Sequence, residues 1–156
     1  MRLRSWRIAK RKHAGEAFTG EGAREYGGRW NSRGIPIVYT AEHASLAILE
    51  VLVHLGAAQL LPDYVLFQLE FDEALVEGLD ETALPEDWRV YPAPVSLRPI
   101  GDQWVTEARS AVLSVPSAVV PIERLFLLNP QHKSYREITI GRQQPLLLDA
   151  RLRKAG

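Results

Sequence analysis

Short stretches of alternating hydrophobic and polar residues predict strands over much of the chain. Tyr64 to Phe71 alternates, with Val65, Phe67, Leu69 and Phe71 on one face and Tyr64, Leu66, Gln68 and Glu70 on the other, as in a half-buried strand. Leu3 to Ala9 and the β-branched run Ile35 to Tyr39 are also predicted to be strands. Gly15 to Gly34 is polar and contains glycine, which indicates a long loop with at most one helical turn.

Two segments have the composition and spacing of helices. Ala41 to Leu55 is predicted to be helical, with Thr40 as its N-cap and Gly56 as the residue that ends it. A second helix is predicted from Ile100 or Gly101 to Leu113, because apolar residues recur there at helical spacing. The helix has to end before Pro116, because a proline interrupts helical hydrogen bonding.

The remaining segments complete an α+β pattern. The acidic stretch Asp72 to Asp87 contains no Lys or Arg and indicates a solvated connection. Further strands are predicted at Ser117–Val120, Leu125–Leu128, Glu137–Ile140 and Leu146–Leu148. Strands and helices do not alternate regularly, so we expect small mixed or antiparallel sheets with two main helices rather than a doubly wound sheet. A length of 156 residues fits a single domain spanning 1–156, with a core of about 3–149.

Composition and charge exclude several classes of protein. The 19 basic and 19 acidic side chains give a formal net charge of zero, which disfavours direct binding to nucleic acid. The absence of Cys excludes disulfides, thiolate nucleophiles and Cys-ligated zinc. No apolar stretch approaches the roughly 18 residues that span a bilayer, and no apolar segment follows the basic N-terminus. We therefore expect a cytoplasmic protein.

Glu50 is the most informative position, because it is the only carboxylate between His43 and Pro62. The surrounding segment is apolar on nearly all sides, so the predicted helix should be largely buried. A carboxylate there is either paired in the core or directed into a pocket. Glu50 and His54 are also four residues apart, as metal ligands often are, but no third ligand is evident and no metal is predicted.

Four further residues have side chains suited to a ligand. Arg29 follows two glycines and can present a planar fork to phosphate oxygens, although a solvated Arg after a Gly-Gly turn is equally common. Arg7 has only small neighbours on its strand face, which suits either a cleft or a salt bridge. Tyr39 can stack on a flat ring or be a core aromatic residue. Ser117 lacks the G-x-S-x-G context of a nucleophile, so a hydrogen bond to a ligand or to a carboxylate is expected instead.

Six short motifs in series resemble the RES domain family from about Leu3 to Asp149. They are Trp6-Arg7-Ile8, Tyr26-Gly27-Gly28-Arg29-Trp30-Asn31, Ile37-Val38-Tyr39-Thr40-Ala41, Ala47-Ile48-Leu49-Glu50, Ser117-Ala118-Val119-Val120-Pro121 and Asn129-Pro130-Gln131-His132. One departure is Leu125, where many members of the family carry Asn.

The resemblance implies a fold similar to that of ADP-ribosyltransferases and a role as the toxin of a bacterial type II toxin–antitoxin pair. It implies an Xre-like antitoxin partner that supplies any DNA binding, a homodimer within the complex, and NAD as substrate with no separate cofactor. By position, it implies that Glu50, Tyr39 and Arg29 are catalytic, and that Arg7 and Ser117 join Arg29 and Tyr39 in binding NAD.

The residue types suit this reaction. Cleavage between nicotinamide and ribose leaves positive charge on the ribose, which a fixed carboxylate such as Glu50 stabilises. Arg29 and Arg7 offer complementary charge to the pyrophosphate, and Tyr39 can stack on the nicotinamide ring. Water and phosphate both remain open as acceptors. Two alternatives also remain: a mono-ADP-ribosyltransferase that modifies a metabolic enzyme, and a non-enzymatic binding module in which Arg and Glu simply pair.

Overall fold

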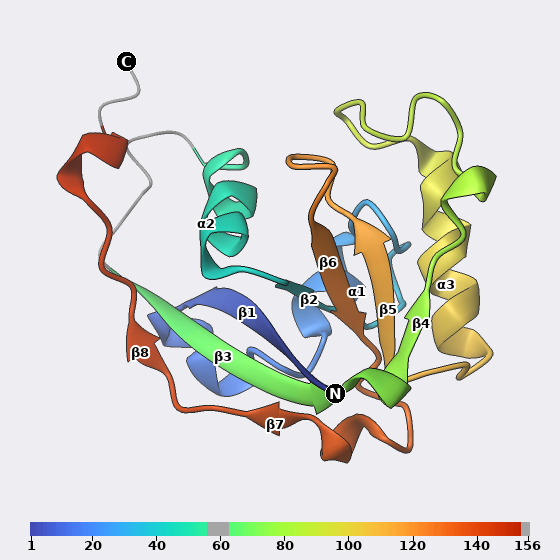
Figure 1. Ribbon diagram of the computed structural model, residues 1–156. Helices are drawn as coiled ribbons and strands as arrows, with labels where there is room; N and C mark the ends of the chain where they lie inside the picture. Colours follow the sequence, from blue (N-terminus) through green and yellow to red (C-terminus); the bar gives the residue numbers. More distant parts are fainter. Residues whose placement is uncertain (56–62, 154–156) are drawn as a thin grey trace.

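A computed structural model describes residues 1–55 and 63–153 as one bent sheet with helices packed against it (Figure 1). The sheet has eight strands in the order β4-β5-β6-β2-β1-β3-β7, and β8 also pairs with β3. The strands are β1 (Arg2–Lys10), β2 (Val38–Ala41), β3 (Tyr64–Asp72), β4 (Val76–Gly78), β5 (Val112–Pro116), β6 (Arg124–Leu128), β7 (Thr139–Ile140) and β8 (Gln144–Pro145). The α+β class is confirmed, with one sheet in place of the several small ones expected.

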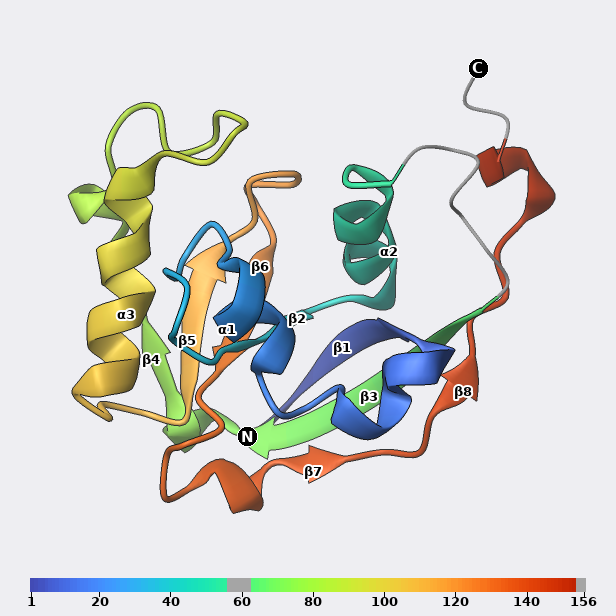
Figure 2. The ribbon, with the colours of Figure 1, turned by 180° about the vertical axis from the view of Figure 1, so that it is seen from behind.

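Pairing within the sheet is antiparallel except between β4 and β5. The longest pairing joins β1 to β3 over nine residues, from Arg2 opposite Asp72 to Lys10 opposite Tyr64. By contrast, β1 and β2 share a single registered pair, Trp6 with Ala41. The sheet therefore bends at this short junction, which separates the β1–β3 part from the β2–β6–β5–β4 part (Figures 1 and 2).

The α-helices are α1 (Glu21–Tyr26), α2 (Ala44–Leu52) and α3 (Arg98–Thr106). Single 3₁₀ turns occur at Arg11–Glu16, Glu73–Leu75, Glu81–Ala83, Val95–Leu97, Tyr135–Glu137 and Ala150–Arg153. The two longest helices, α2 and α3, are the two that the sequence predicted. Within the described ranges, none of the helices has the length and apolar composition needed to cross a bilayer.

Strand alternation divides the interior into two cores, one on each face of the sheet. On β6, Leu125 and Leu127 belong to one core, while Phe126 and Leu128 belong to the other. The first core also contains Leu46 of α2, Trp104 of α3 and Trp30 from the loop after α1. Both main helices therefore cover the same face of the bent sheet.

The start of α2 differs from the prediction. Thr40 does not cap the helix, because β2 continues through Thr40 and Ala41 in register with β6. The Thr40 hydroxyl instead donates to the carbonyl of Phe126 at 2.7 Å, and His43 takes the N-cap position. The helix ends at Leu52 rather than Leu55, and Gly56, the expected stop, lies outside the described residues.

The second helix also ends earlier than predicted. Helix α3 stops at Thr106, and Val112 to Pro116 form a fully buried strand between β4 and β6. A strand buried on both faces has a continuous apolar sequence, which periodicity alone does not separate from a helix. Ser117 consequently follows this strand instead of starting one.

Three smaller assignments are also corrected. The acidic segment 72–87 contains β4, which pairs in parallel with β5. Sequence reasoning missed this strand because it has no clear alternation of apolar and polar residues. The predicted strand at 146–148 is replaced by β8, which ends at Pro145. The strand expected over 137–140 is reduced to Thr139 and Ile140, because Tyr135–Glu137 forms a 3₁₀ turn.

Gly101 makes the contact between α3 and the loop that carries Arg29. A Cβ at Gly101 would lie 2.0 Å from the backbone oxygen of Trp30, so the helix and the loop would have to separate. We expect Gly101→Ala to lower the free energy of unfolding by about 3 kcal/mol, measured by urea denaturation. Gly22, in α1, has nothing within 4 Å of such a Cβ. Gly22→Ala is the matched control and should raise stability by roughly 0.5–1 kcal/mol; equal effects of the two substitutions would contradict the packing described.

Candidate functional site

Glu50 projects from α2 as a half-buried carboxylate with one direct partner. Its Oε1 accepts a hydrogen bond of 2.7 Å from the hydroxyl of Ser117, 67 positions later in the chain. Helix α2 packs mainly on β1 and β2, which places Glu50 on the face of the sheet that holds the first core. The structure therefore brings together two of the residues singled out from the sequence.

Ser117 is fully buried at the end of β5, where it organises the turn that follows. Its hydroxyl oxygen accepts hydrogen bonds from the amides of Val119 (3.1 Å) and Val120 (3.0 Å). A hydroxyl has one proton and two lone pairs, so these two amides leave the proton free to point at Glu50. The expected hydrogen bond from Ser117 to a carboxylate is present in the structure.

Arg29 sits in a tight turn between Gly28 and Asn31, whose backbones form an isolated antiparallel bridge. A Cβ at Gly28 would lie 2.7 Å from the Tyr39 hydroxyl, so the turn passes too close to Tyr39 for any other residue. Asn31 is completely buried, and its amide nitrogen donates to the carbonyls of Ala23, Ser32 and Ile35. The turn is thus fixed from inside by Asn31.

The Arg29 guanidinium is held by backbone carbonyls. Its Nη1 donates to the oxygens of Trp88 (2.7 Å) and Val90 (3.1 Å), which lie in the segment before α3. Partial burial lowers the pKa of Arg29, and the nearby negative charge of Glu50 opposes that shift. Within the described part of the chain no ion pair neutralises this guanidinium, so Arg29 and Glu50 face the same region as opposite, unpaired charges.

Tyr39 lies beside the Arg29 turn with its hydroxyl fixed. The phenol donates to Oδ1 of Asn31 at 2.5 Å and accepts from the amide of Trp30 at 3.3 Å. Burial raises the pKa of Tyr39 well above its ordinary value, so the phenol stays protonated. Its ring remains half-buried and packs against the first core. The proposed stacking of this ring on a ligand stays a prediction.

Arg7 is not brought to this group. Its neighbours on the same face of β1, Leu3 and Ala9, belong to the second core, whereas Trp6 and Ile8 pack against the first. The Arg7 guanidinium donates to the carbonyls of Ala17 (2.6 Å) and Tyr39 (2.9 Å), and burial lowers its pKa. Its small neighbours on the strand, Ser5 and Ala9, leave room for these contacts, one of which ties Arg7 to the backbone of Tyr39. Binding of NAD by Arg7 stays a prediction.

Helix α2 is less buried than its composition predicted. Only Leu46 and Ala47 are fully buried, whereas Leu49 is 41% exposed and Val53 is 58% exposed. The prediction of a largely buried helix was wrong, because α2 packs on β1 and β2 with one side and leaves Leu49 and Val53 exposed on another. Glu50 lies at the boundary between the two sides.

Glu50 and His54 do not belong to a cluster of three or more possible metal ligands in the part of the chain that the structure describes. Among the described residues, the group of that size close enough to share an ion is Glu42 and His43, just before α2, with Glu123, just before β6. There His43 Nδ1 lies 3.0 Å from Glu123 Oε1, while Oε1 of Glu42 accepts from the amide of Arg124. His54 instead faces the ring of Tyr91, at 5.9 Å between centroids.

The segment from Trp88 to Tyr91 was missed by sequence reasoning. It contributes backbone carbonyls to Arg29, and backbone groups leave no trace in a pattern of side chains. The signal that was available is the run Trp88-Arg89-Val90-Tyr91-Pro92, which places two large aromatic residues in an otherwise acidic, proline-containing connection.

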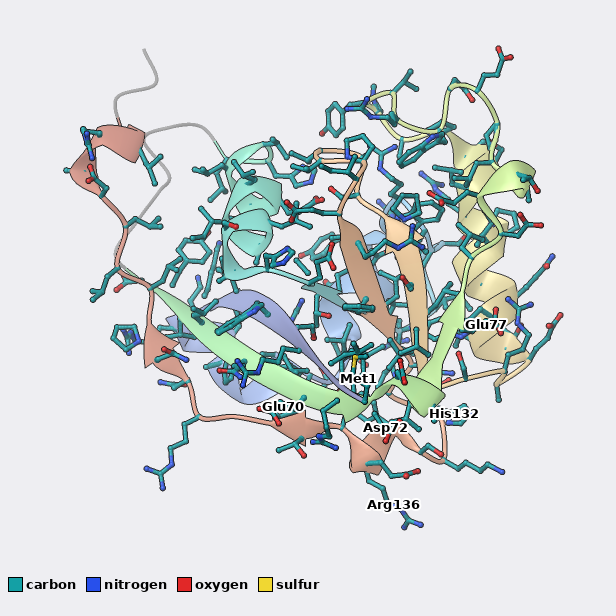
Figure 3. The ribbon with its side chains drawn as sticks, viewed as in Figure 1. Met1, Glu70, Asp72, Glu77, His132 and Arg136 are labelled. Carbon is teal, nitrogen blue, oxygen red and sulfur yellow. The ribbon has the colours of Figure 1, made fainter. Side chains whose placement is uncertain are left out.

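A separate pocket of about 380 Å³ lies on the far edge of the sheet. It is lined by Gln68, Glu70, Thr139, Gly141, Arg142, Gln143 and Gln144. Figure 3 labels Glu70 on β3 beside this edge, away from α2. Its open, amide-rich wall contains none of the residues singled out from the sequence, so we do not connect it with them.

The chemistry available at Glu50 follows from these contacts. A carboxylate oriented by a neutral hydroxyl and a guanidinium oriented by neutral carbonyls both keep their charges available to a ligand. Such a pair fits a molecule that carries an anionic group and develops positive charge nearby.

Comparison with known proteins identifies a family for this chain. A family model described as the RES domain matches residues 4–149. The toxin named Res of Yersinia enterocolitica is 40% identical over 141 residues, covering 90% of this chain and 92% of its own. A protein of a Sphingobium species named Prs ADP-ribosylating toxin is 38% identical over 156 residues, covering 96% of this chain and 97% of its own.

A solved structure has the same fold. It is the crystal structure of the MbcT–MbcA toxin–antitoxin complex of M. tuberculosis, matched with a TM-score of 0.75 over 94% of this chain and 85% of that chain. The sequence identity is 19%, so this similarity concerns the fold.

Asn31 offers a direct test of the described turn. We expect Asn31→Ala to lower the free energy of unfolding by on the order of 3 kcal/mol, because it removes the buried hydrogen bonds from the Asn31 amide to the carbonyls of Ala23, Ser32 and Ile35 and takes away the acceptor of the Tyr39 hydroxyl. Tyr39→Phe removes one of these bonds and should cost about 1 kcal/mol. Both are measured by chemical denaturation. An unchanged free energy of unfolding in Asn31→Ala would show that the network does not hold the turn.

Proposed function

The chain belongs to the RES domain family, and on that premise we propose that it is the toxin of a toxin–antitoxin pair and cleaves NAD between nicotinamide and ribose. The observation that supports this most is the Glu50 carboxylate held by Ser117 opposite the guanidinium of Arg29. NAD supplies what such a pair binds: a pyrophosphate with two negative charges, and a ribose that becomes positive as the bond breaks.

In the proposed reaction the bond between the ribose carbon and the nicotinamide nitrogen breaks, and both electrons leave with nicotinamide. The ring, which carried a positive charge, leaves as a neutral molecule and needs no proton. The charge moves to the ribose as an oxocarbenium ion, which the Glu50 carboxylate stabilises. Since the leaving group needs no acid, one carboxylate is sufficient, and NAD is the substrate of a reaction that uses no further cofactor.

An acceptor then completes the reaction. Water attacks the ribose carbon and loses a proton, giving ADP-ribose, and Glu50 is placed to accept that proton or to hold a ribose hydroxyl. Inorganic phosphate in place of water would give a phosphorylated ADP-ribose. Arg29 binds the pyrophosphate through the Nε and Nη2 groups that its backbone contacts leave open, and Tyr39 contributes a fixed aromatic edge beside it.

The proposed setting is bacterial and cytoplasmic, where NAD is available. The partner is an antitoxin, as in the toxin–antitoxin complex whose toxin has this fold. We assign any contact with DNA to an Xre-like antitoxin, because this chain has no net positive charge. A homodimer inside that complex is part of the same proposal.

Glu50→Gln tests the mechanism directly. The substitution keeps the shape of the side chain and removes its charge, so the purified variant should fold normally and lose at least about a hundredfold in nicotinamide release from NAD. Glu16→Gln changes an exposed carboxylate on another part of the chain and is the matched control. Nicotinamide release measured by chromatography decides the matter: a fully active Glu50→Gln would rule out this mechanism.

The melting temperature measured with and without NAD separates an enzyme from a simple binding module. If Arg29 and Glu50 only pair with one another, NAD should not raise the melting temperature of the wild-type chain, and Arg29→Ala should weaken folding rather than ligand binding. Stabilisation of Glu50→Gln by NAD, without turnover, is the result expected for the enzyme.

A second function is favoured by one comparison. The Sphingobium relative, named an ADP-ribosylating toxin, is nearly as similar as the toxins named Res, so transfer of ADP-ribose to a protein is the alternative for this chain. Both reactions share the first step and differ in the acceptor.

Labelled NAD added to a bacterial lysate distinguishes the two. For the proposed NAD-degrading toxin, label in the adenylate half should appear as free ADP-ribose or its phosphate. Retention of the label on one protein band, lost with Glu50→Gln, would establish transfer instead. Release of nicotinamide alone does not discriminate, so both products have to be followed in one experiment.

A further inference from the structure

The segment between Leu84 and Val95 extends from the side of α3 in the direction of α2 and then returns to α3 (Figure 1). Three contacts anchor it to the elements that carry the site. The carbonyls of Trp88 and Val90 hold Arg29, and Arg89 Nε donates to the carbonyl of Ala118, next to Ser117, at 3.1 Å. The ring of Trp88 also lies 6.4 Å from that of Trp30. The backbone on either side of Arg89 is therefore tied to both the Arg29 turn and the Ser117 turn.

Tyr91 follows directly after this anchored backbone, yet its side chain is 77% exposed. The aromatic contact of its ring is with His54, at 5.9 Å between centroids and 54° between planes. His54 lies four residues after Glu50, about one helical turn farther along. The Tyr91 ring thus stands at the rim of the site, between the Arg29 guanidinium and the far end of α2.

Such a ring contributes little to the core, because most of its apolar surface remains in water. Its backbone is nevertheless held in place by neighbours that also hold Arg29. An aromatic ring that is fixed at its base and open on its surface is suited to stacking against a flat group of a ligand.

We propose that Tyr91 contacts the substrate and that its ring stacks on the adenine base. This rests on the proposed function, because it takes NAD as the ligand. Glu50 fixes the reacting ribose and the nicotinamide end, while Arg29 takes the pyrophosphate. The residue before Tyr91, Val90, accepts a hydrogen bond from Arg29 through its carbonyl, and the Tyr91 ring contacts His54, four residues after Glu50. Tyr91 therefore lies beyond the pyrophosphate site, where we place the adenosine half of NAD.

The test measures binding in the Glu50→Gln background, so that no ligand is consumed. Isothermal titration with NAD, ADP-ribose and nicotinamide mononucleotide compares the parent with Tyr91→Ala and Tyr91→Phe. Stacking of a base on an aromatic side chain is worth roughly 1–3 kcal/mol, so Tyr91→Ala should bind NAD and ADP-ribose about tenfold more weakly. Nicotinamide mononucleotide, which lacks adenine, should bind within about twofold of the parent, and Tyr91→Phe, which keeps the ring, should restore tight binding.

Leu147→Ala is the control for removal of a large exposed apolar side chain elsewhere, since Leu147 is 87% exposed near β8. It should change none of the three affinities. Weaker binding of NAD without weaker binding of ADP-ribose would place Tyr91 at the nicotinamide ring, and unchanged affinities would remove it from the site; either result overturns the inference. If the Glu50→Gln parent binds neither NAD nor ADP-ribose, the proposed function itself fails, and the two failures are thereby distinguished.

Discussion

The hydrogen bond from Ser117 to Glu50 is the interaction on which the arrangement of the site depends. It joins α2, which packs on β1 and β2 where the sheet bends, to the turn after β5. The amides of Val119 and Val120 occupy the lone pairs of the Ser117 hydroxyl, so its proton is directed at the carboxylate. Glu50 is oriented by a neutral donor and keeps its full charge, which a Lys or Arg partner would have offset.

Arg29, which carries the opposite charge, is likewise oriented by neutral groups. Two backbone carbonyls fix the guanidinium, and the carboxylate whose negative charge opposes the lowering of the pKa of Arg29 by burial is that of Glu50. Charges oriented by dipoles rather than by counter-ions need little reorganisation when a ligand arrives, which is the condition for electrostatic stabilisation of a transition state. The burial that lowers the pKa of Arg29 also strengthens its interaction with a ligand anion, because fewer water molecules screen it.

The sequence predicted those parts of the fold in which local pattern and tertiary environment agree. β1, β3 and β6 were found within one or two residues, because one core or the other receives every second side chain. The start of α2 was placed too early, because pairing with β6 keeps Thr40 and Ala41 extended. Glu50, Arg29 and Ser117 could be singled out because they contribute polar side chains to the site. The structure shows Arg7 donating to carbonyls, and its assignment to the ligand stays a prediction. Trp88 and Val90 were missed because their contribution is a backbone oxygen.

The same geometry explains why closely similar relatives can carry names for different activities. Breaking the bond to nicotinamide needs a carboxylate beside the ribose and a cation at the pyrophosphate, and neither group senses what attacks afterwards. Water, phosphate and a protein side chain all approach the same carbon, so Glu50, Ser117 and Arg29 do not by themselves select among them. Under the proposed reaction, selection therefore depends on the groups near the ribose carbon that control which acceptor reaches it. Differences between relatives in the acceptor should be sought there rather than in Glu50, Ser117 and Arg29.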